Sequence, residues 1–381
     1  MNLIKKLSPY SLITLSTLGF STLGFSTLGF STLGFSTLLT GCGTASDSHE
    51  QRLILPAEKF DLTHWQINTP TDVDNDGVVD LIKVKELQTY QHPDYFYINE
   101  DGNLVFAAPN KAITSVNSTN TRSELHHMLG GEQGEKYAIA NNFALKANKQ
   151  ASEFAQVGGN LQATLNVNHV SKRAKYADKP TAFSVVVGQV HASQDPRRIA
   201  EGEGYGYGNE PLKIYYKKLP NHEYGSVFWT YELNLEKDNP QRTDIAYPVW
   251  GKAWLDTSNP GDEGIALNEE FSYEVNIYEN TMYLTFTTAR HKEVNYAIDL
   301  TNNIDAYGNV DERDHPNGYT GDANFFKAGA YNQCSTKDDP SFRYPACPGT
   351  GDWATDKENG DYTQVTFSRL TAGNARDPQA K

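Results

Sequence analysis

The segment 325–333, FFKAGAYNQ, alternates between two kinds of side chain. Successive residues of a β-strand point to opposite faces, so an extended segment would turn Ala328 and Ala330 to one side. Lys327 and Tyr331 would then lie in line on the other side, where a binding site needs polar groups. The pattern predicts a strand that is packed on one face and open to a ligand on the other.

Two distant segments repeat this arrangement. In 121–128, TRSELHHM, the polar face holds Arg122, Glu124 and His126. In 184–192, SVVVGQVHA, one face holds Val185, Val187, Gln189 and His191, and the other face holds Gly188, Val190 and Ala192. If these strands are neighbours in one sheet, their polar side chains converge on a groove.

Composition and pattern both favour an all-β protein. Aromatic residues make up 12% of the 381 residues, 22 residues are tyrosine, and long amphipathic helical runs are hard to find. Strands favour such residues. Alternating segments recur at 161–170, 227–235 and 363–370, and a hairpin turning near Glu279-Asn280 is expected at 271–289. We expect a β-jelly roll, a sandwich of antiparallel sheets with a concave substrate groove.

Residues 1–41 have the features of an export signal. Lys5 and Lys6 precede an uncharged segment that contains four tandem copies of STLGF at 16–35 and ends in LTGC. This resembles a bacterial lipoprotein signal peptide, in which Cys42 would carry the lipid. A transmembrane anchor is the alternative, because the uncharged segment is long enough to span a bilayer. Gly43 resembles a signal for onward transfer, so we expect an exported, lipid-anchored protein at the outer membrane or cell surface.

The rest of the chain is expected to form one domain between a short tether and a short tail. Residues 42–52 form a polar tether, 53–371 one domain without a clear linker, and 372–381 a frayed tail. Once Cys42 is assigned to lipid, Cys334 and Cys347 remain, and a disulfide between them is expected in an exported chain. A metal-binding pair is the competing interpretation, but no CxxC or nearby histidine cluster supports it.

Charge and motif content limit which partners and cofactors the chain is expected to bind. The 33 basic and 47 acidic residues give a net charge of −14, which disfavours a general nucleic-acid binder. The stretch 72–80, DVDNDGVVD, resembles the start of a calcium loop through Asp72, Asp74, Asp76 and Asp80. However, Lys83 stands where a bidentate Glu is expected, and an acidic surface turn is the other interpretation. No other cofactor is expected, and we expect a monomer.

The polar groups of the three strands suit elimination better than hydrolysis. Glycoside hydrolysis usually requires two carboxylates, whereas Glu124 is the one carboxylate of the set and stands beside Arg122. Arginine grips a carboxylate, and histidine and tyrosine can move protons. β-Elimination from a polyuronate needs both functions, because the C5 proton becomes removable only when the neighbouring carboxylate is neutralised.

RSEL at 122–125, QVH at 189–191 and FFKAGAYNQ at 325–333 strongly resemble the three motif blocks of polysaccharide lyase family 7, the alginate lyases. LKIYYKK at 212–218 is similar to a further strand of that family, and the resemblance spans roughly residues 53 to 370. It implies a jelly-roll alginate lyase in which Tyr331 transfers the proton and the carboxylate is neutralised by Arg122, Gln189 and His191. The groups expected to bind the substrate chain are Glu124, His126, Lys213, Lys327 and Gln333.

Two positions depart from the family pattern. His126 stands where the family usually has a second arginine, which makes the charge at that position sensitive to pH. Phe325 replaces a frequent tyrosine and so removes a hydroxyl group. The simplest interpretation of His126 and His127 places both on the rim of the groove.

Stereochemistry separates two substrates. In mannuronate the C5 proton and O4 lie on the same side, so Tyr331 could act as both base and acid. In guluronate they lie on opposite sides, and His191 could act as base with Tyr331 as acid. Val190 in the Q-x-H block resembles a mannuronate-leaning signature, so a mannuronate preference is expected.

Two alternatives remain: a protein of another class, a non-catalytic polyuronate-binding surface lipoprotein, and a lyase for another polyuronate such as glucuronan. The sequence also leaves open whether cleavage is endolytic or exolytic. The long segments 192–211 and 335–361 are the candidates for groove walls.

Overall fold

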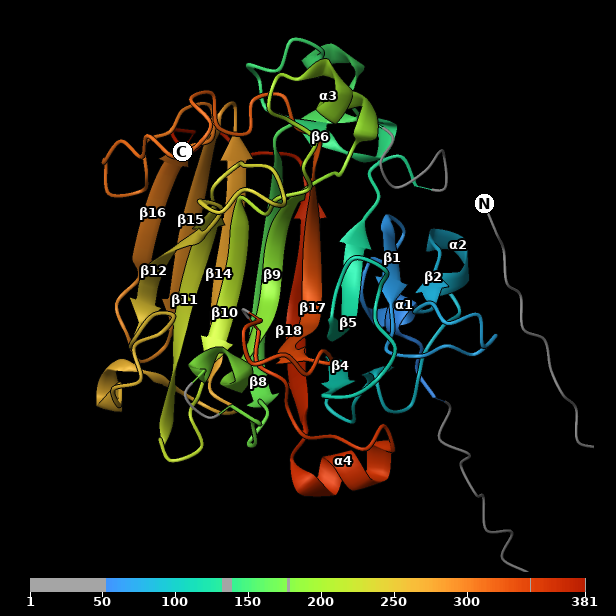
Figure 1. The fold of residues 1–381 in the computed structure, drawn as a ribbon. Coiled ribbons are helices and arrows are strands. Elements are labelled where there is room, and N and C mark those ends of the chain that lie inside the picture. Colours follow the sequence, from blue (N-terminus) through green and yellow to red (C-terminus); the bar gives the residue numbers. More distant parts are fainter. Residues whose placement is uncertain (1–52, 132–138, 177–178, 343, 381) are drawn as a thin grey trace, which may run out of the picture. The chain divides into compact units, whose positions relative to one another are not determined.

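Two β-sheets stack face to face in the computed structural model, which describes residues 53–131, 139–176, 179–342 and 344–380 (Figure 1). The predicted signal segment, Cys42 and the tether lie outside these residues. The first sheet has the order β12 (Asp244–Trp250), β11 (Tyr224–Glu232), β10 (Leu212–Lys217), β9 (Ser184–Ala192), β17 (Asn324–Ser335), β5 (Asn120–His127), β1 (Trp65–Asn68) and β2 (Leu81–Ile82). The short strands β6 (Phe143–Ala144), β7 (Gln156–Val157) and β13 (Ile265–Ala266) adjoin it.

The second sheet has the order β16 (Val294–Asp299), β15 (Thr281–Thr288), β14 (Glu270–Tyr278), β8 (Gly159–His169), β18 (Tyr362–Gly373), β4 (Leu104–Pro109) and β3 (Phe96–Ile98). Among the described strands, only β6 and β7 pair in parallel. The observed architecture confirms the all-β sandwich of antiparallel sheets that the alternating segments predicted.

Helices are short and lie outside the sheets. They are α1 (Pro56–Lys59), α2 (Val84–Leu87), α3 (Pro196–Glu201) and α4 (Trp353–Asn359), with 3₁₀ turns at Ile139–Asn141, Ala151–Glu153, Pro180–Phe183 and Gly261–Glu263. In the described ranges, no helix is long and apolar enough to cross a membrane. α3 lies beyond one end of β9 and β17, and α4 beyond the other end of the sandwich (Figure 1).

The hydrophobic core lies between the two sheets and follows from the alternation along each strand. In β8, the alternate residues Leu161, Ala163, Leu165 and Val167 are buried, while Gln162, Thr164 and Asn166 between them are partly exposed. Trp229 of the first sheet and Phe286 of the second are fully buried in the same core. Burial of each such large apolar side chain stabilises the fold by about 1.5–3 kcal/mol.

The predicted hairpin is formed by β14 and β15. Tyr278 pairs with Thr281, so the turn contains only Glu279 and Asn280. Glu279 has φ +56, a left-handed backbone conformation that suits the twist of a two-residue hairpin loop.

The three polar motif segments form adjacent strands, as predicted. β17 lies between β5 and β9, with Lys327 opposite His126 on one side and Gln189 on the other. Tyr331 lies opposite Arg122. We call the outer face of these strands, the one opposite the core, the site face. On β17 the alternation is as predicted, since Ala328 and Ala330 pack into the core behind the polar row.

One face prediction for β9 is wrong. Val185 and Val187 pack in the core, not beside Gln189 and His191, while Val186 packs on the site face with Tyr331. The cause is a register shift: Gly188 pairs with Ile214 of β10, but the next pair is Val186 with Tyr215. The extra residue is a β-bulge, which reverses the in–out alternation on one side of it.

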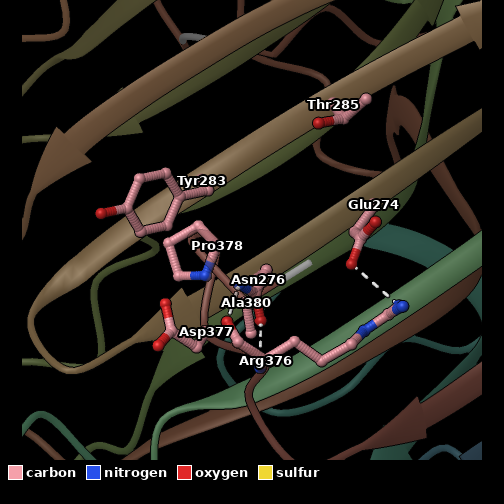
Figure 2. Close-up of a pocket in the computed structure, with 8 residues that line it drawn as sticks. All are labelled: Glu274, Asn276, Tyr283, Thr285, Arg376, Asp377, Pro378 and Ala380. Atoms are coloured by element: carbon pink, nitrogen blue, oxygen red, sulfur yellow. Dashed lines mark hydrogen bonds and ion pairs between the residues drawn. The ribbon is translucent and has the colours of Figure 1, made fainter.

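The C-terminal tail is bound further along than its predicted start at residue 372. β18 pairs with β8 through Gly373, and Arg376 then exchanges two hydrogen bonds with the side chain of Asn276, at 2.7 and 2.8 Å. The Arg376 guanidinium also pairs with Glu274 at 2.9 Å. Figure 2 shows these residues beside Tyr283 at a pocket on the outer face of the second sheet. The residues just after the predicted boundary are therefore ordered by specific contacts.

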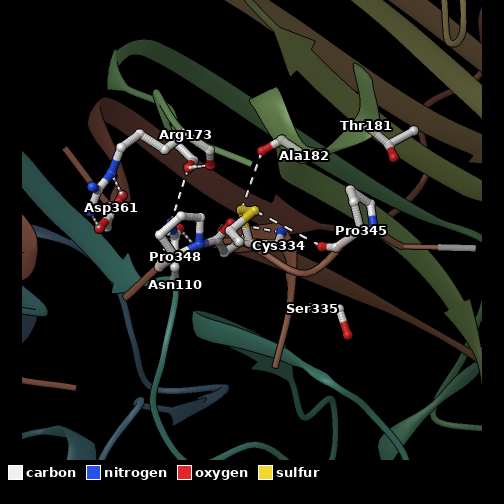
Figure 3. Close-up of a disulfide and its surroundings, with 12 residues drawn as sticks. Asn110, Arg173, Thr181, Ala182, Cys334, Ser335, Pro345, Pro348 and Asp361 are labelled. Atoms are coloured by element: carbon white, nitrogen blue, oxygen red, sulfur yellow. Dashed lines mark hydrogen bonds and ion pairs between the residues drawn. A yellow bond between two sulfur atoms is a disulfide. The ribbon is translucent and has the colours of Figure 1, made fainter. Parts of the chain in front are cut away.

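The expected disulfide between Cys334 and Cys347 is present (Figure 3). It joins the end of β17 to the following loop in a small buried cluster with Ala182 and Phe183. Nearby, the guanidinium of Arg173 pairs with Asp361, which precedes β18. The disulfide thus fixes the first part of the predicted wall segment 335–361 against the sheet.

Candidate active site

Glu124 of β5 lies at the centre of the polar groups on the site face. Its Oε2 accepts hydrogen bonds from Lys327 Nζ and, at 3.1 Å, from Arg122 Nη1. Its Oε1 accepts a hydrogen bond from Gln189 Nε2. Only 1% of Glu124 is exposed, so its carboxylate is committed to positioning three groups that surround it.

Burial and charge act in opposite directions on this network. Burial alone would raise the pKa of Glu124, but Lys327 and Arg122 outweigh burial and hold that pKa below its usual range. Burial lowers the pKa of Lys327 to about 8, although Glu124 acts to raise it. Burial also acts to lower the pKa of Arg122, but Tyr331, Glu124 and Glu210 raise it overall. One carboxylate between two cations leaves positive charge in excess, which favours an anionic ligand.

Tyr331 is held at its ring and at its hydroxyl group. The guanidinium carbon of Arg122 lies 4.0 Å from the ring centroid. The hydroxyl oxygen lies 3.3 Å from Ser118 Oγ, which in turn accepts a hydrogen bond of 3.1 Å from the backbone N–H of Asn120. Tyr331 is partly exposed, so a ligand on the site face can reach it. Ser118 lies in the loop before the motif strand, so the motif pattern does not predict it.

An apolar cluster borders Tyr331 on the β10–β11 side. The rings of Tyr215 and Phe228 stack at 4.8 Å, and Trp254 meets Tyr215 edge-on at 5.3 Å. Lys217 Nζ donates hydrogen bonds to the carbonyls of Trp254, at 2.5 Å, and Asp256, at 2.7 Å, and so anchors this loop. The loop around Trp254 is therefore a wall element beyond the two that the sequence suggested.

Three rings from adjacent strands stack across the site face. Phe325 of β17 lies between His126 of β5, at 3.9 Å, and His191 of β9, at 5.0 Å, with an interplanar angle of 13° in both pairs. His126 is 7% exposed and His127 is 5% exposed, so the prediction that both lie on the rim is wrong. β5 is a central strand: the ring stack covers His126, and His127 packs against Trp65 at 4.6 Å on the core side.

Lys213 of β10 is surrounded by carboxylates. Its ammonium group lies 3.1 Å from Asp244, 3.3 Å from Glu210 and 3.9 Å from Glu232. Burial acts to lower the pKa of Lys213, but Glu210 and Glu232 raise it well above its ordinary value. The side chain is 4% exposed, so its charge is balanced inside the protein.

The three carboxylates around Lys213 lie outside the motif blocks, so the motifs do not predict them. The available signal was Lys213 itself, which pairs with Gln189 in mid-strand and follows the alternation of the site face. A buried lysine in that position requires carboxylate partners, because an unpaired buried charge is strongly destabilising.

Gln333 and the acidic turn complete the predicted residues. Gln333 is 1% exposed and donates a hydrogen bond of 3.2 Å to the carbonyl of Tyr331, so it braces its own strand. In the turn, carboxylate oxygens of Asp72, Asp74 and Asp76 lie within 4.8 Å of one another, which fits a divalent cation. Asp80 is not part of this group; its carboxylate accepts the backbone N–H of Val73 at 3.2 Å.

The assembled groups form an anion receptor beside a tyrosine hydroxyl. Arg122 and Lys327 provide positive charge, Gln189 provides an amide, and His191 adds a ring that can donate hydrogen bonds. Tyr331 provides an oxygen that can carry a proton. Such a set can neutralise a carboxylate and move a proton next to it, which is what elimination from a uronic acid requires.

The chain is similar in sequence and in structure to known alginate lyases. The family profile described as alginate lyase matches residues 60–374. An alginate lyase from Klebsiella pneumoniae is 32% identical over 329 residues, which cover 83% of this chain and 90% of that protein. The crystal structure of the alginate lyase from Klebsiella pneumoniae superposes with a TM-score of 0.64 at 28% identity, over 86% of this chain and 100% of that one. The crystal structure of an exolytic family 7 alginate lyase from Zobellia galactanivorans superposes with a TM-score of 0.65 at 33% identity, over 85% of this chain and 99% of that one.

Proposed function

Because this chain belongs to the alginate lyases of polysaccharide lyase family 7, with their β-jelly roll, we propose that it cleaves alginate by β-elimination at the site around Tyr331. The observation that carries the proposal is the network centred on Glu124. One buried carboxylate holds an arginine, a lysine and a glutamine side by side, and the arginine lies against the tyrosine ring.

The network supports neutralisation of the substrate carboxylate. Arg122, Gln189 and His191 face the uronate carboxylate next to the scissile bond, and Lys327 adds positive charge below it. Removal of the C5 proton places negative charge on that carboxylate, so fixed cations lower the barrier more than they strengthen ground-state binding. Glu124 acts by positioning these groups, since it is buried beneath them.

Proton transfer is assigned to Tyr331. With its oxygen deprotonated, Tyr331 takes the C5 proton; the C4–C5 double bond forms, the C4–O4 bond breaks, and the proton passes to O4. In mannuronate both positions lie on one face of the sugar, so a single oxygen serves both steps. The preference for mannuronate that the Q-x-H block suggested is part of this proposal.

The assay follows the ultraviolet absorbance of the unsaturated product during incubation with alginate. The chain as it stands should produce this absorbance, and Tyr331→Phe should lose turnover while it still binds the polymer. Near-normal turnover of Tyr331→Phe would contradict the role of its hydroxyl. Tyr283→Phe, on the outer face of the second sheet, is the matched control and should leave the rate unchanged.

We further propose that the enzyme is exported and anchored by lipid at Cys42, at the outer membrane or cell surface. The LTGC sequence supports the anchor, and the Cys334–Cys347 disulfide agrees with an oxidising compartment. Metabolic labelling with a radioactive fatty acid tests this, because a Cys42→Ser variant should lose the label.

A calcium ion at the acidic turn is a separate proposal, supported by the approach of Asp72, Asp74 and Asp76. All three are at least partly exposed, so the ion would stabilise the turn and would take no part in the elimination. Calcium should then raise the melting temperature, and Asp74→Asn should abolish that rise. A melting temperature that is unaffected by calcium or chelator would remove the proposal.

A further inference from the structure

His191 meets a hydrogen-bond acceptor at each ring nitrogen. Its Nδ1 lies 2.6 Å from the backbone carbonyl of Ala192. Its Nε2 lies 3.2 Å from Oε1 of Glu210, a residue just before β10 that lies outside the motif blocks. The plane of the imidazole is fixed by Phe325, which stacks on it at 5.0 Å. The orientation of the His191 ring is therefore fixed by three contacts, with the carbonyl of Ala192, the carboxylate of Glu210 and the ring of Phe325.

A neutral imidazole cannot satisfy both acceptors. It carries one N–H, so its other nitrogen would turn a lone pair toward an oxygen. Glu210 cannot supply the missing proton, because Lys213, Glu232 and His191 outweigh burial and hold its pKa well below the usual range. Because the charged Glu210 carboxylate is a stronger acceptor than a backbone carbonyl, Nε2 is the nitrogen that must carry a proton.

The Glu210 carboxylate is itself fixed by buried groups. Lys213 Nζ lies 3.3 Å from its Oε2, and the backbone N–H of Glu210 donates to Glu232 Oε2 at 3.0 Å. Glu232 is 1% exposed, and Arg242 pairs with its other oxygen at 3.0 Å. Glu210 therefore cannot swing away from His191 without breaking contacts inside the fold.

We propose that Glu210 is a positioning residue that keeps a proton on Nε2 of His191, so that this nitrogen donates to Glu210 and takes no proton from C5. This inference rests on the proposed function. It decides between the two roles that His191 can have in family 7 chemistry: a place beside the substrate carboxylate is retained, and the role of base is excluded while Glu210 occupies Nε2.

The consequence is that the enzyme prefers one of the two uronates as substrate. Guluronate requires a base on the face opposite Tyr331, and His191 is the residue that could provide it. With Nε2 bonded to Glu210, that route is closed, whereas the mannuronate route through Tyr331 remains open. Glu210 thereby becomes a specificity-determining residue that never touches the reacting atoms.

The direct test is nitrogen NMR of the full chain labelled at histidine, with His191→Asn used to assign the His191 resonances. In the unmodified chain, Nε2 of His191 should resonate as a protonated nitrogen. In Glu210→Ala, the proton should move to Nδ1, which faces the carbonyl of Ala192, and Nε2 should resonate as an unprotonated nitrogen. An unprotonated Nε2 in the unmodified chain would overturn the proposal, whatever the enzyme does to alginate.

The second test compares initial rates on poly-mannuronate and poly-guluronate. The unmodified enzyme should favour poly-mannuronate by about tenfold or more, and Glu210→Ala should shift the ratio of the two rates toward poly-guluronate by about tenfold. A merely structural defect would lower both rates together, so an unchanged ratio would contradict a positioning role. Glu100→Ala, an exposed glutamate between β3 and β4 of the second sheet, is the control and should leave the ratio unchanged.

The two tests separate this inference from the function on which it rests. If the unmodified chain forms no unsaturated product from either polymer, the proposed function fails, while the NMR result still decides the state of His191. If product forms but poly-guluronate is cleaved faster, the function stands and the role given to Glu210 is wrong.

Discussion

The guanidinium carbon of Arg122 lies 4.0 Å from the ring centroid of Tyr331, directly across the β5–β17 ladder. The contact joins the group that neutralises charge to the group that moves the proton. The two roles in the proposed mechanism are therefore coupled through one side-chain pair.

Arg122→Lys should show this coupling. The lysine keeps a positive charge but lacks the planar fork that both stacks on Tyr331 and bonds Glu124. We expect kcat on alginate to fall about tenfold to a hundredfold, which corresponds to roughly 1.4–2.8 kcal/mol of lost transition-state stabilisation. Steady-state kinetics measure this, and Arg369→Lys on the second sheet should behave as the unmodified enzyme. Equal kcat values for Arg122→Lys and Arg369→Lys would show that a positive charge at position 122 is sufficient without stacking, and would refute the coupling.

Ser118→Ala tests the orientation of the Tyr331 hydroxyl. The substitution removes the hydroxyl 3.3 Å away but leaves the ring and Arg122 in place. Because one neutral hydrogen bond is worth about 0.5–1.5 kcal/mol, kcat should fall about twofold to tenfold with little change in KM. A rise in KM at constant kcat would instead mean that Ser118 contacts the substrate chain.

Lys327 should set an alkaline limit on substrate binding. Burial lowers its pKa to about 8, so its charge is lost as the pH rises through that value, and the excess positive charge of the site face goes with it. KM for alginate should therefore rise above about pH 8. Lys327→Met should have a raised KM that no longer changes between pH 7 and 9. A KM for the unmodified enzyme that is constant across this range would contradict the assignment.

His127 should weaken the fold in acid. Burial lowers its pKa to about 3, with the positive charge of His64 acting in the same direction, whereas an unfolded histidine titrates near its ordinary value of 6.5. The unfolded state therefore binds the extra proton first, and stability falls as the pH drops from about 6.5 toward 3, by up to about 1.4 kcal/mol per pH unit.

The variant His127→Phe isolates this effect. It keeps a ring against Trp65 and removes a buried Nδ1 that has no hydrogen-bond partner among the described residues. Urea unfolding at pH 7 and pH 5 should show a smaller loss of stability for the variant than for the unmodified protein. Identical losses would mean that other groups dominate the acid response.

The disulfide should contribute mainly to stability. Cys334 and Cys347 are 13 positions apart, and closing a loop of this size stabilises the folded state by about 3 kcal/mol. The double variant Cys334→Ser/Cys347→Ser should lose about that amount in urea unfolding, and reduction of the unmodified protein should cause a similar loss. If reduction had no effect on the unfolding midpoint, the loop would be held by its other contacts alone.

Local alternation predicted much of the fold and the central residues of the site. The row Lys327–Tyr331, the polar face of β5 and the hairpin at Glu279 all depend on neighbours in sequence or on simple strand pairing. The bulge at Val187 could not be predicted in this way, because it arises from the register that β9 adopts against two partner strands.

The ion pairs between residues distant in sequence could not be predicted either, for a similar reason. Glu210, Glu232 and Asp244 come from different strands or loops, and only the fold brings them to Lys213. Likewise, the burial of His126 depends on Phe325 of a strand about 200 residues away in sequence. Motif resemblance found the residues at the chemistry, but not the residues that hold them in place.

The stack of His126, Phe325 and His191 has a consequence for protein engineering. Because the three rings lie parallel in one column, a new side chain at position 126 changes the plane that Phe325 can adopt, and through it the plane of His191. Effects of substitutions in the column should therefore be strongly epistatic, and single-site libraries would undervalue combinations that work together. Introducing the arginine and the tyrosine that the family pattern predicts at positions 126 and 325 should be attempted as one paired exchange.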